Sequence, residues 1–232
     1  TSVVIDTITS AGFTVGWTDN SSDETGFKVY TFAATTDCSD ATYSGAPDYT
    51  TAADAVTQVI TSKSTNTWYC AKVVATNANG DSVAAYAAPK YTLANVPTAP
   101  TLGTPTSSTI PVTINQNSNP ANTTYSIKVV QGANTNYLAT SGALSASPVW
   151  DTYANFGGAS GVTSTGLAAN TNYTYSVAAR NGDSTDTAYG TSANATTLTT
   201  YTITASTDVN GTISPLGVTT VDSGSTQAIT FS

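Results

Sequence analysis

The sequence predicts an all-β chain of two tandem β-sandwiches followed by a short C-terminal β segment. Short runs in which apolar and polar residues alternate recur along the chain, separated by clusters of Gly, Asn, Asp, Ser and Pro. Helical periodicity is nearly absent. The segment NTWYCAKVVATNANGDS at 66–82 returns as NTNYTYSVAARNGDS at 170–184. This second copy indicates a repeated structural unit.

Composition adds to the β prediction and indicates where the protein works. Charged residues make up 9% of the 232-residue chain, compared with about 25% in ordinary soluble domains. Thr is abundant, and its branched Cβ suits a half-buried strand. We therefore expect an extracellular or cell-surface protein whose surface is wetted by hydroxyl and amide groups.

Charge and hydropathy exclude two classes of partner. The net charge is −8, and no run of basic residues is present to neutralise phosphates, so we expect no nucleic acid. No stretch approaches the roughly 18 to 20 consecutive apolar residues that a spanning helix needs, so we expect no membrane insertion.

The first unit begins with two readable strands. Phe13, Val15 and Trp17 alternate in GFTVGWT, and Phe27 and Val29 alternate in GFKVY after the polar turn DNSSDETG. A further strand is expected from Val56 to Ile60.

The late strand of the first unit lies in the repeated segment, and its alternation assigns side chains to two faces. One face carries Tyr69, Ala71, Val73 and Ala75, and the other carries Cys70, Lys72, Val74 and Thr76.

The second unit repeats this plan. Its predicted inward residues are Ile110, Val112, Ile114, Tyr125, Ile127, Val129, Tyr173, Tyr175, Val177 and Ala179. The Pro-rich segment NVPTAPTLGTP joins the units as a short, semi-rigid linker. We expect domains at 1–94, 95–199 and 200–232.

Two cysteines, Cys38 and Cys70, form either one disulfide or a pair of reduced thiols. A chain of this composition favours the disulfide, because extracellular compartments oxidise such pairs.

The late strands resemble the fibronectin type III module, an immunoglobulin-like sandwich whose corresponding strand reads Tyr, alternating apolar residues, Ala-x-Asn, then Gly and Ser. The matching residues are Tyr69, Val73, Ala75, Asn77, Gly80 and Ser82 in one copy, and Tyr173, Val177, Ala179, Asn181, Gly182 and Ser184 in the other. Trp17 and the DETGFKVY stretch fit the second and third strands of this family, whereas Ile114 replaces the usual Trp in the second unit. On this alignment the second hairpin is two residues shorter than the first.

The resemblance implies roles for several residues. Tyr69 and Tyr173 are expected at structural corners, with each ring buried and each hydroxyl bonded to backbone upstream. The core is expected to hold Trp17, Val73 and Val177. The resemblance also makes the third and late strands antiparallel neighbours, which brings the Cys38 and Cys70 region together.

The C-terminal stretch, YTITASTDVNGTISPLGVTTVDSGSTQAITFS, predicts two or three strands with turns at Asn210-Gly211 and Ser223-Gly224. It resembles the opening of short β repeats found in long bacterial surface proteins. An incomplete sheet needs a partner for its edges, so we expect strand pairing with a neighbour.

The sequence predicts no catalytic residue and no cofactor. The chain contains no His, which excludes Ser-His-Asp and Cys-His catalysis and zinc sites built on imidazole. Asp19, Asp23 and Glu24 share one loop and could offer oxygen ligands to calcium. Turn formation explains them better, so we expect no metal site.

Two weaker patterns leave alternatives open. Tyr30, Phe32, Trp68 and Trp150 are candidates for sugar stacking or for interface packing. Lys28, Lys72 and Lys128 lie on predicted strands beside Asn-rich sequence, which suits either Lys-Asn crosslinks or, the favoured interpretation, solvated lysines.

These observations predict a non-catalytic structural role, as a stalk or a subunit of a bacterial surface filament. The expected partners are copies of the chain or neighbouring modules, and a polysaccharide in the second place. The alternatives are a spacer or carbohydrate-binding accessory region of a secreted polysaccharide-degrading enzyme, and an adhesin module. Fold alone does not separate them.

Overall fold

The computed structural model describes residues 2–33, 38, 45–208 and 210–232, and within them the chain is built from β-strands. These residues form two compact units. The first comprises Thr1–Val96 with Asn117–Thr124 and Ala179–Ala188, and the second comprises Pro97–Gln116, Tyr125–Ala178 and Tyr189–Ser232. The all-β prediction is confirmed.

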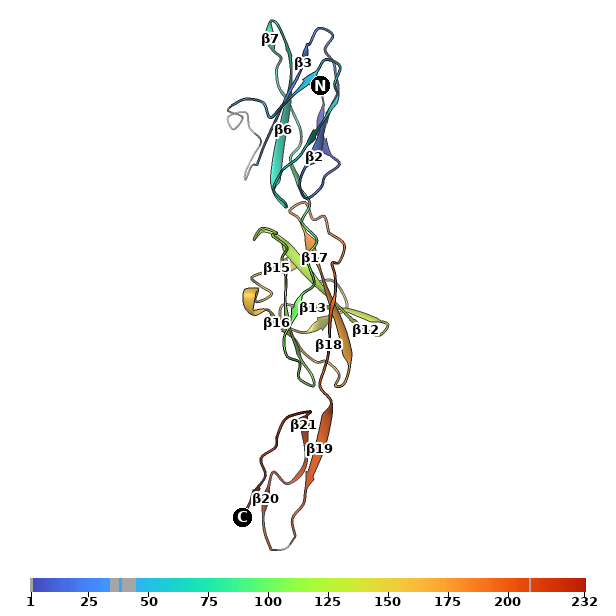
Figure 1. Cartoon of the computed structure of the whole chain (residues 1–232), viewed down its shortest axis with the longest axis vertical. Coiled ribbons are helices and arrows are strands. Elements are labelled where there is room, and N and C mark those ends of the chain that lie inside the picture. Colours follow the sequence, from blue (N-terminus) through green and yellow to red (C-terminus); the bar gives the residue numbers. More distant parts are fainter. Residues whose placement is uncertain (1, 34–37, 39–44, 209) are drawn as a thin grey trace. The chain divides into compact units, whose positions relative to one another are not determined.

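The first sandwich packs a three-stranded sheet against a six-stranded one (Figure 1). The smaller sheet contains β1 (Val3–Asp6), β2 (Phe13–Trp17) and β5 (Thr57–Ile60). The larger contains β4 (Tyr49–Ala52), β3 (Gly26–Ala33), β6 (Trp68–Asn77), β7 (Gly80–Asp81), β8 (Ala85–Tyr86) and β9 (Lys90–Tyr91). The central pair, β3 and β6, is antiparallel, as the family resemblance implies.

Alternation along the strands of this sandwich produces one continuous core. Its buried members are Val3, Ile5, Phe13, Val15, Trp17, Phe27, Val29, Ile60, Tyr69, Ala71, Val73 and Ala87. Trp17 packs against Phe27 with ring centroids 5.3 Å apart. Each strand places every second side chain between the sheets, so this burial follows from the period of two.

The second sandwich has the same two-layer plan. Its smaller sheet contains β10 (Thr101–Leu102), β11 (Ile110–Thr113) and β16 (Val162–Ser164). Its larger sheet contains β14 (Leu144–Ser145), β13 (Asn134–Leu138), β12 (Thr124–Gln131), β17 (Asn172–Arg180), β18 (Ala193–Thr196) and β15 (Asp151–Thr152). A single 3₁₀ turn, η2 (Gly158–Ser160), precedes β16. Ile114 is buried at the position where the family carries Trp.

The C-terminal segment forms two separate strand pairs. β19 (Thr200–Ala205) pairs antiparallel with β21 (Gly217–Asp222), and β20 (Ile213–Ser214) pairs with β22 (Thr230–Phe231). Among the described residues after Thr197 none is buried, so this segment has strand pairing without a core.

The hairpin after the late strand corrects one sequence-based prediction. In the first copy the Ala75 N–H donates to the Ser82 hydroxyl, seven residues on. In the second copy the Ala179 N–H donates to the hydroxyl of Thr187, eight residues on, rather than to Ser184. The prediction of a hairpin two residues shorter is therefore wrong.

The reason lies in the turn of the second copy. The Asn181 side chain accepts the N–H groups of Asp183 and Thr185, and this wider turn takes up the extra residue. The left-handed backbone falls on Ser184, with φ 61°, whereas in the first copy it falls on Gly80, with φ 125°.

Candidate functional site

The residues predicted for the core and corners lie inside the sandwiches. Trp17, Val73 and Val177 are buried. The Tyr69 hydroxyl accepts the Ser64 N–H at 3.0 Å, and the Tyr173 hydroxyl accepts the Ala168 N–H at 2.9 Å. Both tyrosines bond five residues upstream, which fixes the loop that leads into each late strand.

The predicted disulfide is present between Cys38 and Cys70. Their Cα atoms are 5.6 Å apart, and 32 positions separate them in the sequence. Cys70 lies on the face of β6 that points away from the core and is itself buried. The bridge therefore links that face to the segment that follows β3.

Three of the four aromatic candidates lie on β3 and β6 of the first sandwich, and the fourth lies in the second unit. Tyr30 and Phe32 lie on β3 opposite Lys72 and Cys70, on the outward face of the larger sheet of the first sandwich. Trp68 begins β6 opposite Tyr91. Trp150 belongs to the second unit, next to β15.

The three strand lysines contact acidic and aromatic side chains. The Lys28 ammonium donates to both Asp81 carboxylate oxygens, at 2.7 and 2.9 Å. Lys72 Nζ lies 4.9 Å from the centroid of the Tyr30 ring, and Lys128 Nζ lies 4.4 Å from that of Tyr189. These contacts favour solvated, stabilising lysines over crosslinks to Asn.

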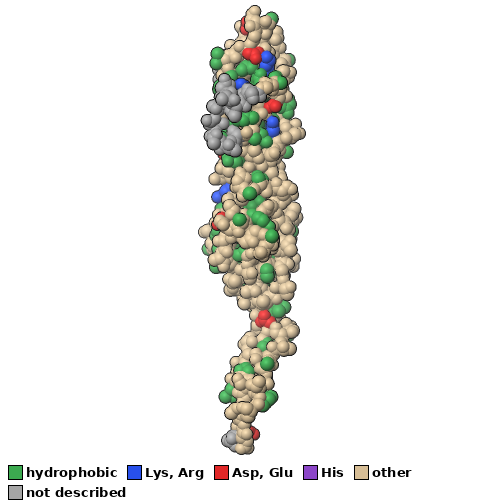
Figure 2. Space-filling model, turned by 90° about the vertical axis from the view of Figure 1, so that its left-hand side faces the viewer, with side chains coloured by type: hydrophobic (Ala, Val, Ile, Leu, Met, Phe, Trp, Pro, Cys, Tyr) green, Lys and Arg blue, Asp and Glu red, His purple; other side chains and the backbone are tan. Residues whose placement is uncertain are grey.

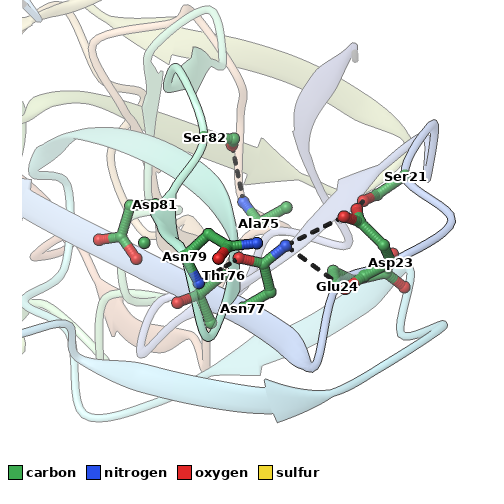
Figure 3. A pocket seen from close by; sticks show the side chains of 10 residues that line it. Ser21, Asp23, Glu24, Ala75, Thr76, Asn77, Asn79, Asp81 and Ser82 are labelled. Atoms are coloured by element: carbon green, nitrogen blue, oxygen red, sulfur yellow. Dashed lines mark hydrogen bonds between the residues drawn. The ribbon is translucent and has the colours of Figure 1, made fainter.

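A pocket of about 220 Å³ lies where the β6–β7 hairpin meets the loop before β3 (Figure 3). The Asn77 amide donates to the Asp23 carboxylate at 3.2 Å and accepts the Asn79 N–H at 2.8 Å through its oxygen. Figure 3 shows Asp81 on the opposite side of these amides from Asp23 and Glu24. Asp81 is thus separated from Asp23 and Glu24.

Two carboxyl groups of this pocket, those of Glu24 and Asp81, have lowered pKa values. Hydrogen bonds from its own backbone N–H, from the Ser21 side chain and from the Asp54 N–H hold the pKa of Glu24 below its ordinary value. The Lys28 ammonium lowers the pKa of Asp81. A general acid in glycoside hydrolysis needs a raised pKa, so neither of these two carboxyl groups is suited to that role.

A second acidic group adjoins the pocket. One carboxylate oxygen from each of Asp19, Glu24 and Asp54 lies within 4.8 Å of the others. Two of these side chains already accept backbone donors, because the Ser21 N–H reaches Asp19 at 2.9 Å and the Asp54 N–H reaches Glu24 at 3.2 Å. The first bond is local to the turn after β2, and the second joins that loop to the β4–β5 connection.

The surface carries few charges on the face drawn in Figure 2, where hydroxyl, amide and backbone atoms cover most of the area. In the described part of the chain, none of the helices has the length and apolar character needed to traverse a lipid bilayer.

Comparison with known proteins yields structural matches alone. No family model matches the sequence, and no curated protein matches it. A segment of two fibronectin type III domains from chicken tenascin superposes with a TM-score of 0.55 at 12% identity, covering 84% of this chain and 98% of that one. The FN1–FN3 domains of chicken CNTN1 give a TM-score of 0.34 at 18% identity, covering 85% of this chain and 65% of that one. The tenascin match establishes a tandem fibronectin type III fold.

Sequence reasoning missed Tyr86, which lies opposite Lys72 on β8. Its short strand, within VAAYAAP, shows no alternation that marks a face. The pairing of β8 with β6 is what places Tyr86 opposite Lys72, which lies opposite Tyr30 on its other side.

Proposed function

We propose that the protein is a non-catalytic structural component of a bacterial cell surface, serving as a stalk or as a subunit of a filament. The observation that carries this proposal is the C-terminal segment, whose paired strands have no buried residue. A pair of two strands is only marginally stable in water by itself, and its unpaired edges can hydrogen-bond to another strand. Addition of strands from a second copy would supply the missing layer.

The apolar face of the β19–β21 pair is the contact that such an assembly would use. Tyr201 lies opposite Val221 and Ile203 opposite Thr219, so these side chains share one face. Tyr201 is 58% exposed. The opposite face carries Thr200, Thr202 and Thr204, which favour water.

The fold and the disulfide support the extracellular part of the proposal. Tandem fibronectin type III sandwiches are structural or adhesive scaffolds, and one disulfide in a chain with few charges fits an oxidising compartment. Surface hydroxyl and amide groups keep such a scaffold hydrated although only 9% of its residues are charged.

The test compares two lysine substitutions on neighbouring residues of β19. Ile203→Lys places a charge on the apolar face, and Thr202→Lys places the same charge on the opposite face as a matched control. We expect the wild type and Thr202→Lys to form oligomers or fibres in sedimentation velocity and negative-stain microscopy, and Ile203→Lys to remain monomeric. Uniform wild-type monomers at all concentrations would exclude the filament.

The outward aromatic side chains of the first sandwich favour one alternative, an accessory region of a secreted polysaccharide-degrading enzyme. The reading frame on both sides of this sequence separates the two functions. A flanking catalytic domain supports the enzyme, whereas further sandwiches or an anchoring signal support the surface structure.

A further inference from the structure

Three side chains form a row across the outward face of the first sandwich. Tyr30 of β3 lies opposite Lys72 of β6, and Lys72 lies opposite Tyr86 of β8. Tyr86 is 41% exposed, and the Lys72 ammonium lies 4.9 Å from the centre of the Tyr30 ring. The Tyr30–Lys72–Tyr86 row thus places the Lys72 ammonium against the Tyr30 ring, with Tyr86 on the neighbouring strand.

The row borders a cavity of about 410 Å³. Val74, Val83 and Ala84 supply apolar wall, and Val83 is 95% exposed. Asp81 and Ser82 supply the polar wall. Apolar and aromatic walls with a few placed polar groups are the usual composition of a site for a small ligand.

The charges around this cavity select among ligands. The cavity walls offer hydrogen-bonding groups of both signs, the Lys72 ammonium and the Asp81 carboxylate, and that carboxylate also accepts from Lys28. The whole chain carries −8, which repels a polyanion at long range. A neutral ligand that has apolar faces and many hydroxyls suits this combination.

We propose that the Tyr30–Lys72–Tyr86 row binds a pyranose unit of a neutral polysaccharide. The tyrosine rings pack against the C–H face of the sugar, as amphipathic aromatic side chains do in wet interfaces. The Lys72 ammonium donates to sugar hydroxyls, and the Asp81 carboxylate accepts from them. Through this site the surface protein would bind a glycan. Binding does not depend on assembly through the C-terminal strands.

Affinity electrophoresis in native gels that contain galactomannan, xyloglucan or laminarin tests the site, with polygalacturonate as the acidic comparison. We expect retardation by at least one of the neutral polysaccharides and weaker or no retardation by polygalacturonate. Tyr86→Ala should weaken binding at least about tenfold, the loss typical of an anchoring aromatic. Lys72→Gln, which keeps the side-chain bulk, should weaken it as well.

Two tyrosines outside the row provide matched controls. Tyr201→Ala removes an exposed ring of β19, and Tyr137→Ala removes the ring opposite Lys128 in the second sandwich. Both should bind as the wild type does, and so should Ile203→Lys. Thermal melting confirms that each variant is folded.

Three results would overturn the proposal. These are no retardation of the wild type by any neutral polysaccharide, undiminished binding by folded Tyr86→Ala, and equal or tighter binding of polygalacturonate. A change in oligomeric state on Tyr86→Ala without glycan binding would instead assign the row to a protein contact.

Discussion

The hydroxyl of Tyr173 lies 2.9 Å from the backbone nitrogen of Ala168, five residues upstream, and accepts its hydrogen. The next inward tyrosine on the same strand, Tyr175, is fully buried, and its hydroxyl has no hydrogen-bond partner among the described residues. Ser164 lies near enough to influence the Tyr175 pKa, yet neither hydroxyl reaches hydrogen-bond geometry. Two tyrosines in one strand thus have different energetic roles.

This difference predicts opposite results for two identical substitutions. Tyr173→Phe should lower the free energy of unfolding by about 1 kcal/mol, because the Ala168 N–H loses its acceptor. Tyr175→Phe should change stability by less than about 0.5 kcal/mol or increase it, because it removes a buried, unpaired hydroxyl. Urea unfolding of both variants measures this, and equal destabilisation would contradict the assignment.

The buried Tyr175 hydroxyl should also make the free energy of unfolding depend on pH in the alkaline range. Burial raises the pKa of Tyr175 to about 12, from the 10.0 of a free tyrosine. The folded state therefore keeps its proton between pH 10 and 12 where the unfolded state loses it. Stability should be unaffected by this group below pH 10 and should fall as the pH rises through that window, by up to about 3 kcal/mol. Short urea titrations at pH 9 to 12 measure the fall, and Tyr175→Phe should reduce it.

Opening the disulfide should destabilise the first sandwich. Cys38 and Cys70 close a loop of 32 positions, and loop-entropy reasoning gives about 3 to 4 kcal/mol for a crosslink of this span. Urea titration of the Cys38→Ser, Cys70→Ala double variant should give a free energy of unfolding that is lower by this amount. The native protein should take up no alkylating label without reductant. Uptake of two labels by the unreduced, folded protein would show that the disulfide is not formed.

Calcium should leave the melting temperature unchanged. The oxygens of Asp19, Glu24 and Asp54 lie close together, but calcium takes six to eight oxygen ligands, and backbone N–H groups already bond to Asp19 and Glu24. Melting curves with calcium and with a chelator check this. A calcium-dependent increase that Glu24→Gln abolishes would establish a site instead.

Asp222 should anchor the C-terminal strands of the second unit. Its carboxylate accepts the Ser107 N–H at 3.0 Å, and hydrogen bonds from Ser107 hold the pKa of Asp222 below its ordinary value. The anchor should therefore be complete above the ordinary pKa of aspartate and should be lost as the pH falls through the lowered value. Asp222→Ala should speed hydrogen exchange at the Ser107 amide at neutral pH. Asp208→Ala, in the same segment, is the control and should leave that exchange unchanged.

Much of the strand architecture could be predicted because the alternation of apolar and polar residues along a strand identifies its buried face. Phe13, Val15 and Trp17 alternate with polar or small residues, and all three lie in the core. The family resemblance pointed to both corner tyrosines, and the hydrogen bond that each makes in the structure spans five residues. Local pattern sufficed where the interacting groups are neighbours in the chain.

The hairpin of the second copy shows the limit of that local pattern. Asn-Gly-Asp-Ser occurs in both copies, but the hydroxyl that bonds to the late strand is Ser82 in one and Thr187 in the other. The Asn181 side chain causes this difference, because its oxygen accepts two N–H groups and so widens the turn. Matching letters therefore did not imply matching hydrogen bonds.

The sequence by itself determined the fold class and the inward faces, because each depends on a period within one segment, and the family resemblance marked the two corner tyrosines. Tertiary structure decided which outward side chains meet. Lys28 reaches Asp81 across 53 positions, and the Tyr30–Lys72–Tyr86 row draws on three strands. Strand pairing and register create these contacts, and a shift of one residue in register would turn each side chain to the other face.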